Sequence, residues 1–285
     1  MRKESYLVCV DSDGCAMDTM NSKHEQCFGP ALIAVWGLKE RQREVLNCWK
    51  RVNLFSETRG INRFLALVLV LEEMGLDCWE QGFGQLKRWT LETKELSAAS
   101  LKEWMDQGEG ESWEYCRKAY QWTLLVNQMI EQMPKDGSHA FAGVKDALEK
   151  IHGKANIAVV SSANRAAVEE EWRREGLLEH VDILMTQENG SKAHCIRELL
   201  GRGYPNHHVL MVGDALGDLK AANINSVLFY PILAGSEEAS WNRLGGQLFE
   251  AFLEEGYKNT LEQEQIRLFH ENLKMLSDSV TETAK

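Results

Sequence analysis

Two aspartates one residue apart, Asp11 and Asp13, follow a run of five mainly apolar residues, 6–10. Such a run predicts a buried strand that leads into a loop, the position at which open α/β sheets carry their chemistry. Side chains two residues apart on an extended segment face the same side, so both carboxylates could share a cation and flank one substrate atom. Asp is also an ordinary turn residue, and Gly14 follows, so a plain strand-end turn is the alternative.

A second apolar run, residues 209–212, ends in Gly213 and Asp214 and is followed by Asp218. This pattern predicts another strand, a turn and the start of a helix. Carboxylates therefore gather at the ends of two predicted strands. Oxygen ligands of this kind suit a hard divalent cation such as Mg²⁺.

Hydroxyl and ammonium groups accompany these carboxylates in the sequence. A third apolar run, residues 157–160, ends in Ser161 and Ser162, whose hydroxyls can donate to an oxyanion. Lys192 opens a predicted helix over 192–200. A nucleophilic carboxylate, a hydroxyl, a lysine and a cation site together suit phosphoryl transfer, because that reaction requires neutralisation of three equatorial oxygens.

In this order, the four motifs resemble those of the haloacid dehalogenase-like hydrolase superfamily. Its pattern is a strand ending in Asp-x-Asp, a strand ending in Ser or Thr, a lysine, and a strand ending in Gly-Asp-x-x-x-Asp. The resemblance covers residues 5–30 and 140–230, and the joint occurrence is more specific than any single motif. It implies an α/β fold, a doubly wound Rossmann-like parallel sheet with an inserted helical cap domain.

The resemblance also implies a role for each motif residue. Asp11 would be the nucleophile that forms an aspartyl-phosphate, and Asp13 the general acid for the leaving group and then the base for water. Ser161 and Lys192 would hold the phosphate. The implied Mg²⁺ ligands are Asp11, Asp214 and the backbone carbonyl of Asp13, with Asp218 as a further or water-mediated partner.

The second aspartate indicates which branch of the superfamily the chain resembles. True haloacid dehalogenases carry another residue there, whereas phosphatases and phosphomutases carry Asp, as Asp13 does here. The resemblance therefore implies an Mg²⁺-dependent phosphatase of a small phosphorylated metabolite. Two alternatives stay open: a phosphomutase similar to β-phosphoglucomutase, and a non-catalytic phosphate-ligand-binding or regulatory protein on the same fold.

The spacing of the motifs predicts the domain organisation. About 120 residues with little strand character separate the first two motifs, and their composition favours helices. We expect a discontinuous α/β core over residues 1–20 and 135–235, and a helical cap over 21–134 with helices at about 21–36, 39–52, 61–75, 97–107 and 111–133. Helical spacing after residue 236 predicts a C-terminal helical extension over 236–285, with helices at about 236–256 and 259–278.

Several residues outside the four motifs are candidates for substrate binding. The segment 58–63 resembles the loop and helix of caps such as that of β-phosphoglucomutase, so Arg63 could contact substrate, with Arg59 as the alternate. His24 lies where many such caps carry a histidine. Solvated surface positions are the alternative for these three. Ser162 and Asn164 could reach the phosphate, or cap the helix that follows.

Composition narrows the class of protein. With 285 residues and 44% apolar content the chain can bury a proper core, and its net charge of −11 argues against a nucleic-acid or anionic-membrane surface. The longest apolar stretch, residues 64–71, is too short to span a membrane. Seven cysteines without a CxxC pair predict reduced thiols and hence a cytoplasmic location. The oligomeric state stays open.

Overall fold

The computed structural model describes residues 4–134 and 139–283 and divides the chain into two compact units. We call the first the sheet unit, Met1–Met20 with Asp136–Leu276, and the second the helical unit, Asn21–Lys135 with Ser277–Lys285. Each unit builds its own hydrophobic core. The boundary predicted between residues 134 and 135 borders residues 135–138, which lie outside the described part of the chain.

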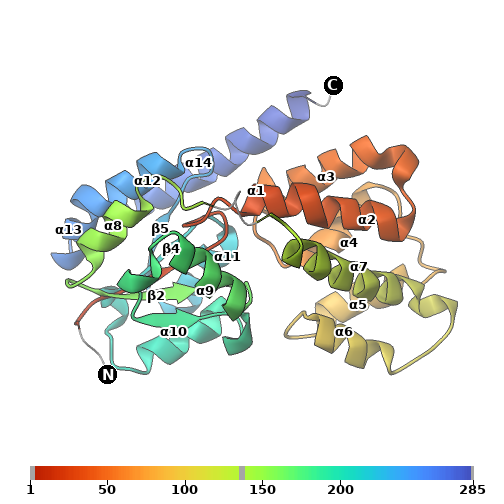
Figure 1. The fold of residues 1–285 in the computed structure, drawn as a ribbon, viewed down its shortest axis with the longest axis horizontal. Coiled ribbons are helices and arrows are strands. Elements are labelled where there is room, and N and C mark those ends of the chain that lie inside the picture. The colour runs from red at the N-terminus through yellow and green to blue at the C-terminus, as the bar shows by residue number, and fades with distance from the viewer. Residues whose placement is uncertain (1–3, 135–138, 284–285) are drawn as a thin grey trace. The chain divides into compact units, whose positions relative to one another are not determined.

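Five parallel strands form the sheet of the sheet unit, in the order β3-β2-β1-β4-β5. Figure 1 labels β2, β4 and β5 of this sheet. Their bounds are Leu7–Val10 for β1, Asn156–Val160 for β2, Ile183–Met185 for β3, Val209–Gly213 for β4 and Leu228–Pro231 for β5. The chain moves outward from β1 through β2 to β3, then returns to the other side of β1 with β4. The strand order therefore reverses beside β1, which is where open α/β sheets bind their ligands.

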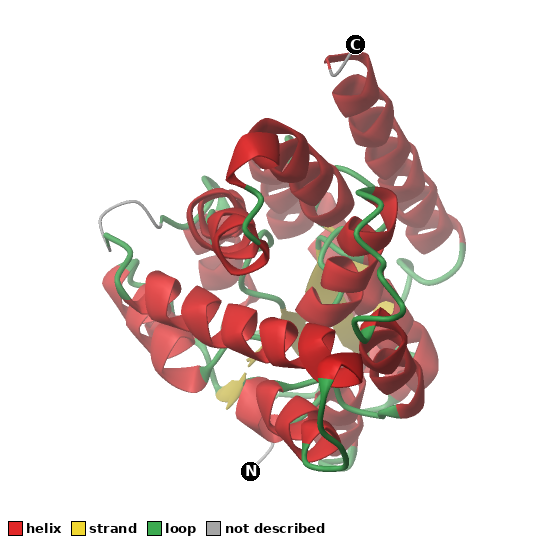
Figure 2. Ribbon diagram, turned by 90° about the vertical axis from the view of Figure 1, so that its right-hand side faces the viewer, coloured by secondary structure: helices red, strands yellow, loops and turns green. Residues whose placement is uncertain are grey.

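Helices cover both faces of this sheet, and the predicted doubly wound α/β fold is confirmed. Figure 2 shows how large a share of the chain is helical. Val8 and Val10 of β1 face one core, while Leu7 and Cys9 face the other. On the Val8 side lie α8 (Val144–Ile151), α9 (Arg165–Arg174), α12 (Glu237–Arg243) and α13 (Phe249–Leu253). On the Leu7 side lie α10 (Lys192–Leu200), α11 (Leu216–Asn225) and the first part of α14 (Thr260–Thr283).

The C-terminal extension contributes to both faces of the sheet. The π-helix η8 (Leu244–Leu248) joins α12 to α13, and it packs so closely on α8 that a Cβ added to Gly245 would lie 3.0 Å from the Cα of Ala147. Gly246 has non-helical backbone angles, so the single helix predicted over 236–256 is interrupted there. On the opposite face, Phe269 and Leu273 of α14 are fully buried.

Helices and loops make up the described residues 21–134, which contain no strand. The helices are α1 (Met20–Lys23), η1 (His24–Phe28), α2 (Gly29–Trp36), η2 (Lys39–Arg41), α3 (Gln42–Leu54), α4 (Arg63–Glu73), α5 (Phe83–Glu92), α6 (Ala98–Met105), η3 (Glu111–Trp113) and α7 (Glu114–Glu131). Trp49, Trp89 and Trp122 are fully buried among them and form the centre of the unit's core. None of the described helices has the length and apolar character needed to cross a membrane.

Several elements were not predicted from the sequence, among them α5, α8, β3 and β5. Helix α5 begins after Gly82, which has a φ of 98° and offers no capping side chain, so the usual start signal is lacking. Strand β3 has only three residues and is partly exposed, and β5 has four. Such short strands carry too little periodicity to be recognised.

The burial of α14 leads to a test of the extension. We expect Phe269→Ala to lower the free energy of unfolding by about 3–5 kcal/mol, because the truncation leaves a cavity on the Leu7 side of the sheet. Met275→Ala on the same helix should change it by less than about 0.5 kcal/mol, since Met275 is 63% exposed. Urea unfolding of both variants measures the difference, and equal effects would contradict the packing of α14 on the sheet.

Candidate active site

The loop after β1 holds Asp11 in a fixed orientation. Its backbone N–H donates to the carbonyl of Val212 at 3.0 Å, which continues the pairing with β4 beyond the end of the strand. Its Oδ1 accepts from the backbone N–H of Ser12 at 2.8 Å, and the side chain is almost fully buried. Both the main chain and the carboxylate of Asp11 are therefore positioned before any ligand binds.

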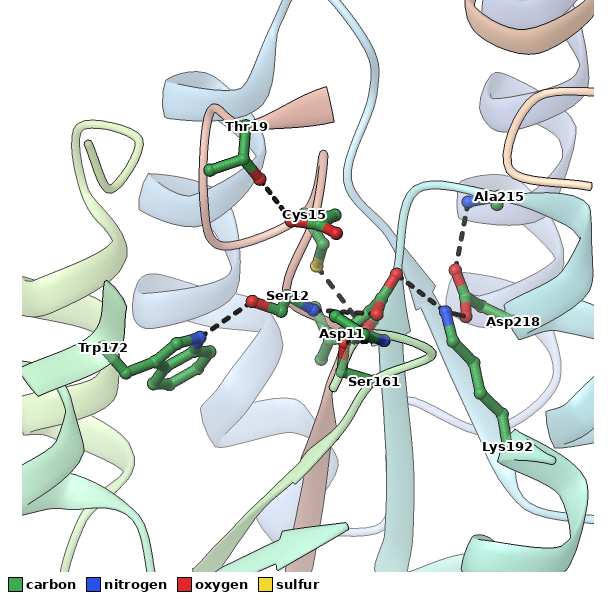
Figure 3. A network of polar contacts seen from close by, with 12 residues as sticks. Asp11, Ser12, Cys15, Thr19, Ser161, Trp172, Lys192, Ala215 and Asp218 are labelled. Carbon is green, nitrogen blue, oxygen red and sulfur yellow. Dashed lines mark hydrogen bonds and ion pairs between the residues drawn. The ribbon is translucent and has the colours of Figure 1, made fainter. Parts of the chain in front are cut away.

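Lys192 connects two of the carboxylates (Figure 3). It is the first residue of α10, and its Nζ lies 2.7 Å from Oδ2 of Asp11 and 2.5 Å from Oδ1 of Asp218. The helix is positioned by Ser191, whose side chain caps it by accepting from the N–H of His194. Lys192 thus contacts the loop after β1 and helix α11, which come from distant parts of the sequence.

The turn after β4 requires a glycine at position 213. A Cβ added to Gly213 would lie 2.3 Å from Oδ2 of Asp218, too close for any side chain. That same oxygen accepts from the backbone N–H of Ala215 at 3.2 Å, so Asp218 closes the turn and starts α11. Asp214, at the tip of the turn, is also buried. The glycine of the Gly-Asp-x-x-x-Asp motif is therefore required because only a residue without a Cβ leaves room for the carboxylate of Asp218.

Three buried carboxylates share a small space. Asp11, Asp214 and Asp218 each offer an oxygen within 4.8 Å of the others. Burial raises the pKa of Asp11 to about 7, although the Lys192 ammonium acts to lower it, and burial also raises the pKa of Asp218. Burial acts to lower the pKa of Lys192, but Asp11 and Asp218 outweigh it and raise that pKa. The lysine therefore stays charged and compensates only part of the negative charge.

The residues present fit a divalent cation. Three carboxylates against one ammonium leave a net negative charge, and carboxylate oxygens are the ligands that Mg²⁺ prefers. Asp11 and Asp214 would hold the ion directly. Both oxygens of Asp218 already accept hydrogen bonds, from Lys192 and from the N–H of Ala215, which favours a water-mediated role for that residue.

Asp13 has a hydroxyl group among its partners. Its side chain is half-buried, and its Oδ1 accepts a hydrogen bond from the hydroxyl of the buried Thr19. Sequence reasoning missed Thr19, because a threonine six residues after an aspartate carries no recognisable signal. The contact holds one oxygen of Asp13, so the carboxylate is oriented separately from the cation ligands.

Ser161 follows β2 at the same edge of the sheet. Its backbone N–H donates to the carbonyl of Met185 at 3.0 Å, and its Oγ accepts from the N–H of Ala163 at 3.1 Å. An accepting hydroxyl keeps its hydrogen for donation to an oxyanion. Ser162 is exposed, and the side chain of Asn164 caps α9 by accepting from the N–H of Ala167 at 2.9 Å. The capping alternative therefore applies to Asn164, and phosphate contact stays a prediction for both.

The three predicted binding residues of residues 21–134 have partners inside the helical unit. Arg59 is buried, and its guanidinium donates to the carbonyl of Leu54 at 2.9 Å, which closes the loop between α3 and α4. Arg63 donates to Asn127 at 2.7 Å. The contacts of His24 are aromatic and polar: it stacks on Phe28 with ring centroids 4.6 Å apart, and its Nδ1 accepts from the indole of Trp49 at 3.0 Å. Substrate contact stays a prediction for all three.

Comparison with known families decides the class of the protein. Residues 77–229, more than half of the chain, match the family model of the haloacid dehalogenase-like hydrolases. The chain belongs to this family. The matched range contains Ser161, Lys192, Asp214 and Asp218, whereas Asp11 and Asp13 precede it. The protein is therefore an enzyme, a hydrolase of the haloacid dehalogenase-like type.

Solved structures are similar to this haloacid dehalogenase-like hydrolase at low identity. One is a protein provisionally named as a phosphoglycolate phosphatase from Lactobacillus delbrueckii subsp. bulgaricus, at 13% identity and a TM-score of 0.49, covering 86% of this chain and 92% of that one. Another is a haloacid dehalogenase-like family hydrolase from Xanthomonas campestris, at 11% identity and a TM-score of 0.48, covering 90% and 94%. None of the curated proteins compared with the chain matches it.

The raised pKa of Asp11 predicts how cation binding depends on pH. Mg²⁺ binds the ionised carboxylate, and a pKa of about 7 leaves part of Asp11 protonated near neutrality. We expect the affinity for Mg²⁺ to increase as the pH rises from about 6 to about 8. Isothermal titration calorimetry at several pH values measures this slope. Asp11→Asn should flatten it, and an equally steep slope in that variant would contradict the assignment to Asp11.

Proposed function

We propose that this hydrolase is an Mg²⁺-dependent phosphatase that uses Asp11 as nucleophile and acts on a small phosphorylated metabolite. One observation supports this above all others. The carboxylate of Asp11 is held by the N–H of Ser12 at 2.8 Å and by Lys192 at 2.7 Å, beside two further buried carboxylates. A fixed nucleophile, a cation site and an ammonium at one point are the components that phosphoryl transfer requires.

In the first step, a carboxylate oxygen of Asp11 attacks the phosphorus, the bond from phosphorus to the ester oxygen breaks, and an aspartyl-phosphate forms. Asp13 gives its proton to the departing ester oxygen, which leaves as an alcohol. The hydrogen bond from Thr19 orients the carboxyl group of Asp13 for this transfer. Ser161 donates its hydroxyl hydrogen to a phosphoryl oxygen, and Lys192 adds positive charge there.

In the second step, a water molecule attacks the phosphorus of the aspartyl-phosphate and the bond to Asp11 breaks. Asp13, now ionised, accepts a proton from that water, so inorganic phosphate leaves and both carboxyl groups return to their starting state. Bound Mg²⁺ would neutralise charge on the phosphoryl oxygens throughout. Burial of the site strengthens each of these charge interactions.

The class of substrate and the location also belong to the proposal. The four motifs supply the chemistry, and an insertion of more than 100 residues supplies the surface that a small metabolite would need for selection. Within it, Arg63, with Arg59 as the alternate, and His24 are the proposed substrate contacts. All seven cysteines carry free thiols, which supports a reducing, cytoplasmic location.

Release of inorganic phosphate tests the proposal. Phosphorylated sugars, nucleotides, phosphoglycolate and 4-nitrophenyl phosphate are each incubated with the enzyme in Mg²⁺ and in chelator. We expect Mg²⁺-dependent release, and Asp11→Asn should lower it on the order of 10³-fold or more. Asp18→Asn is the matched control, because Asp18 lies in the same loop but is exposed. Conversion of a sugar phosphate to its isomer without release of inorganic phosphate would indicate a phosphomutase. Absence of any turnover would indicate a binding protein.

Thr19 allows a finer test of the role of Asp13. Valine has nearly the shape of threonine without the hydroxyl, so Thr19→Val removes the hydrogen bond to Asp13. We expect kcat to fall about tenfold, which corresponds to the loss of one hydrogen bond of about 1.4 kcal/mol. Thr90→Val removes a buried hydroxyl that donates to the backbone carbonyl of Lys87 in the helical unit, and it should leave kcat unchanged. Equal loss in both variants would contradict a role of Thr19 in catalysis.

A further inference from the structure

Two buried tryptophans donate hydrogen bonds to the loop that carries Asp11 and Asp13. Trp172 of α9 donates from its indole Nε1 to Oγ of Ser12 at 2.9 Å (Figure 3). Trp241 of α12 donates from Nε1 to the backbone carbonyl of Cys15, also at 2.9 Å. Both tryptophans are fully buried. The two contacts flank Asp13 in the sequence, one residue before it and two residues after it.

The loop itself is compact between these two points. The carbonyl of Ser12 accepts from the N–H groups of Cys15, Ala16 and Met17 at 3.3, 3.0 and 2.8 Å. Ser12 and Cys15 are fully buried, and burial raises the pKa of the Cys15 thiol well above its usual range, so this thiol stays neutral. The loop therefore has an internal turn, and one indole donor contacts it on either side of Asp13.

We infer that Trp172 and Trp241 are positioning residues, which hold Asp13 where it can protonate the leaving group. This inference rests on the proposed phosphatase function. Neither indole reaches the reacting atoms in this assignment; Trp172 acts through the side chain of Ser12, and Trp241 acts through the backbone carbonyl of Cys15. Trp241 belongs to the C-terminal extension, so this extension would serve the catalytic step as well as the stability of the sheet unit.

Two properties of the contacts support the inference. An indole N–H has one hydrogen to donate, so a buried one fixes the acceptor in a single direction. Trp241 packs closely against the start of α8: a Cβ added to Gly143 would lie 3.3 Å from the Cβ of Trp241. This close packing leaves Trp241 little room to move. A rigid donor on each side restricts the loop more than solvent contacts could, and a misplacement of about 1 Å can lower a rate about a hundredfold.

The test uses the dependence of the rate on the leaving group. An alkyl phosphate such as propyl phosphate needs a proton from Asp13 to leave, whereas 4-nitrophenyl phosphate has a good leaving group and needs it far less. We expect Trp172→Phe and Trp241→Phe each to lower kcat/KM for propyl phosphate about tenfold more than for 4-nitrophenyl phosphate. Loss of folded enzyme alone would lower both values by the same factor.

Trp89→Phe is the matched control. Trp89 is also fully buried, and its indole N–H has no hydrogen-bond partner among the described residues. Its replacement should leave the ratio of the two kcat/KM values unchanged. Ser12→Ala removes the acceptor without altering a core helix, so it should reproduce the change caused by Trp172→Phe, and the double variant should be no worse than either single one.

The outcomes separate the two proposals. If the wild-type enzyme hydrolyses neither phosphate, the proposed phosphatase function fails. If it hydrolyses both, but the Trp172, Trp241 and Ser12 variants keep the wild-type ratio, the positioning role is overturned while the phosphatase function stands. A changed ratio in these variants, with an unchanged one in Trp89→Phe, supports both.

Discussion

The rest of the site depends on the ion pairs that the buried ammonium of Lys192 makes with Asp11 and Asp218. Asp11, Asp214 and Asp218 lie within 4.8 Å of one another in the interior, where like charges repel strongly. Lys192 contacts two of the three and offsets part of that repulsion. Removing one partner from such a buried group leaves an uncompensated charge, which costs about 3–5 kcal/mol. The site therefore keeps a net negative charge, which a divalent cation would balance.

The fold brings these charges together through the strand order. β1 and β4 are neighbours, and helices α10 and α11 begin at the same edge of the sheet, so carboxylates more than 200 positions apart, Asp11 and Asp214, meet there. Gly213 allows Asp218 to approach the turn, and Asp218 in turn fixes the start of α11. The same carboxylate thus serves the local structure and the electrostatics. A substitution at Gly213 would disturb both, because no Cβ fits beside that carboxylate.

The motif residues and the fold class could be predicted from the sequence because they lie next to strong apolar runs at strand ends. Contacts between distant segments could not. Trp172 and Trp241 donate to the loop that carries Asp11 and Asp13, but a hydrogen bond that spans 160 or 226 positions leaves no mark in the local pattern. The arginines of the segment 58–63 show a related difficulty. Spacing alone does not distinguish Arg59, which is buried on the carbonyl of Leu54, from an exposed substrate contact.

The C-terminal extension shows how a segment outside the motifs can affect them. Its helices pack on both faces of the sheet: α12 and α13 with α8, and α14 with α10 and α11. This packing is hydrophobic and non-directional, and by itself it would only stabilise the fold. The indole of Trp241 adds direction, because its N–H reaches the carbonyl of Cys15 in the catalytic loop. A loop that carries the proposed general acid, Asp13, would need fixed partners on both sides, and here one such partner comes from beyond the last motif.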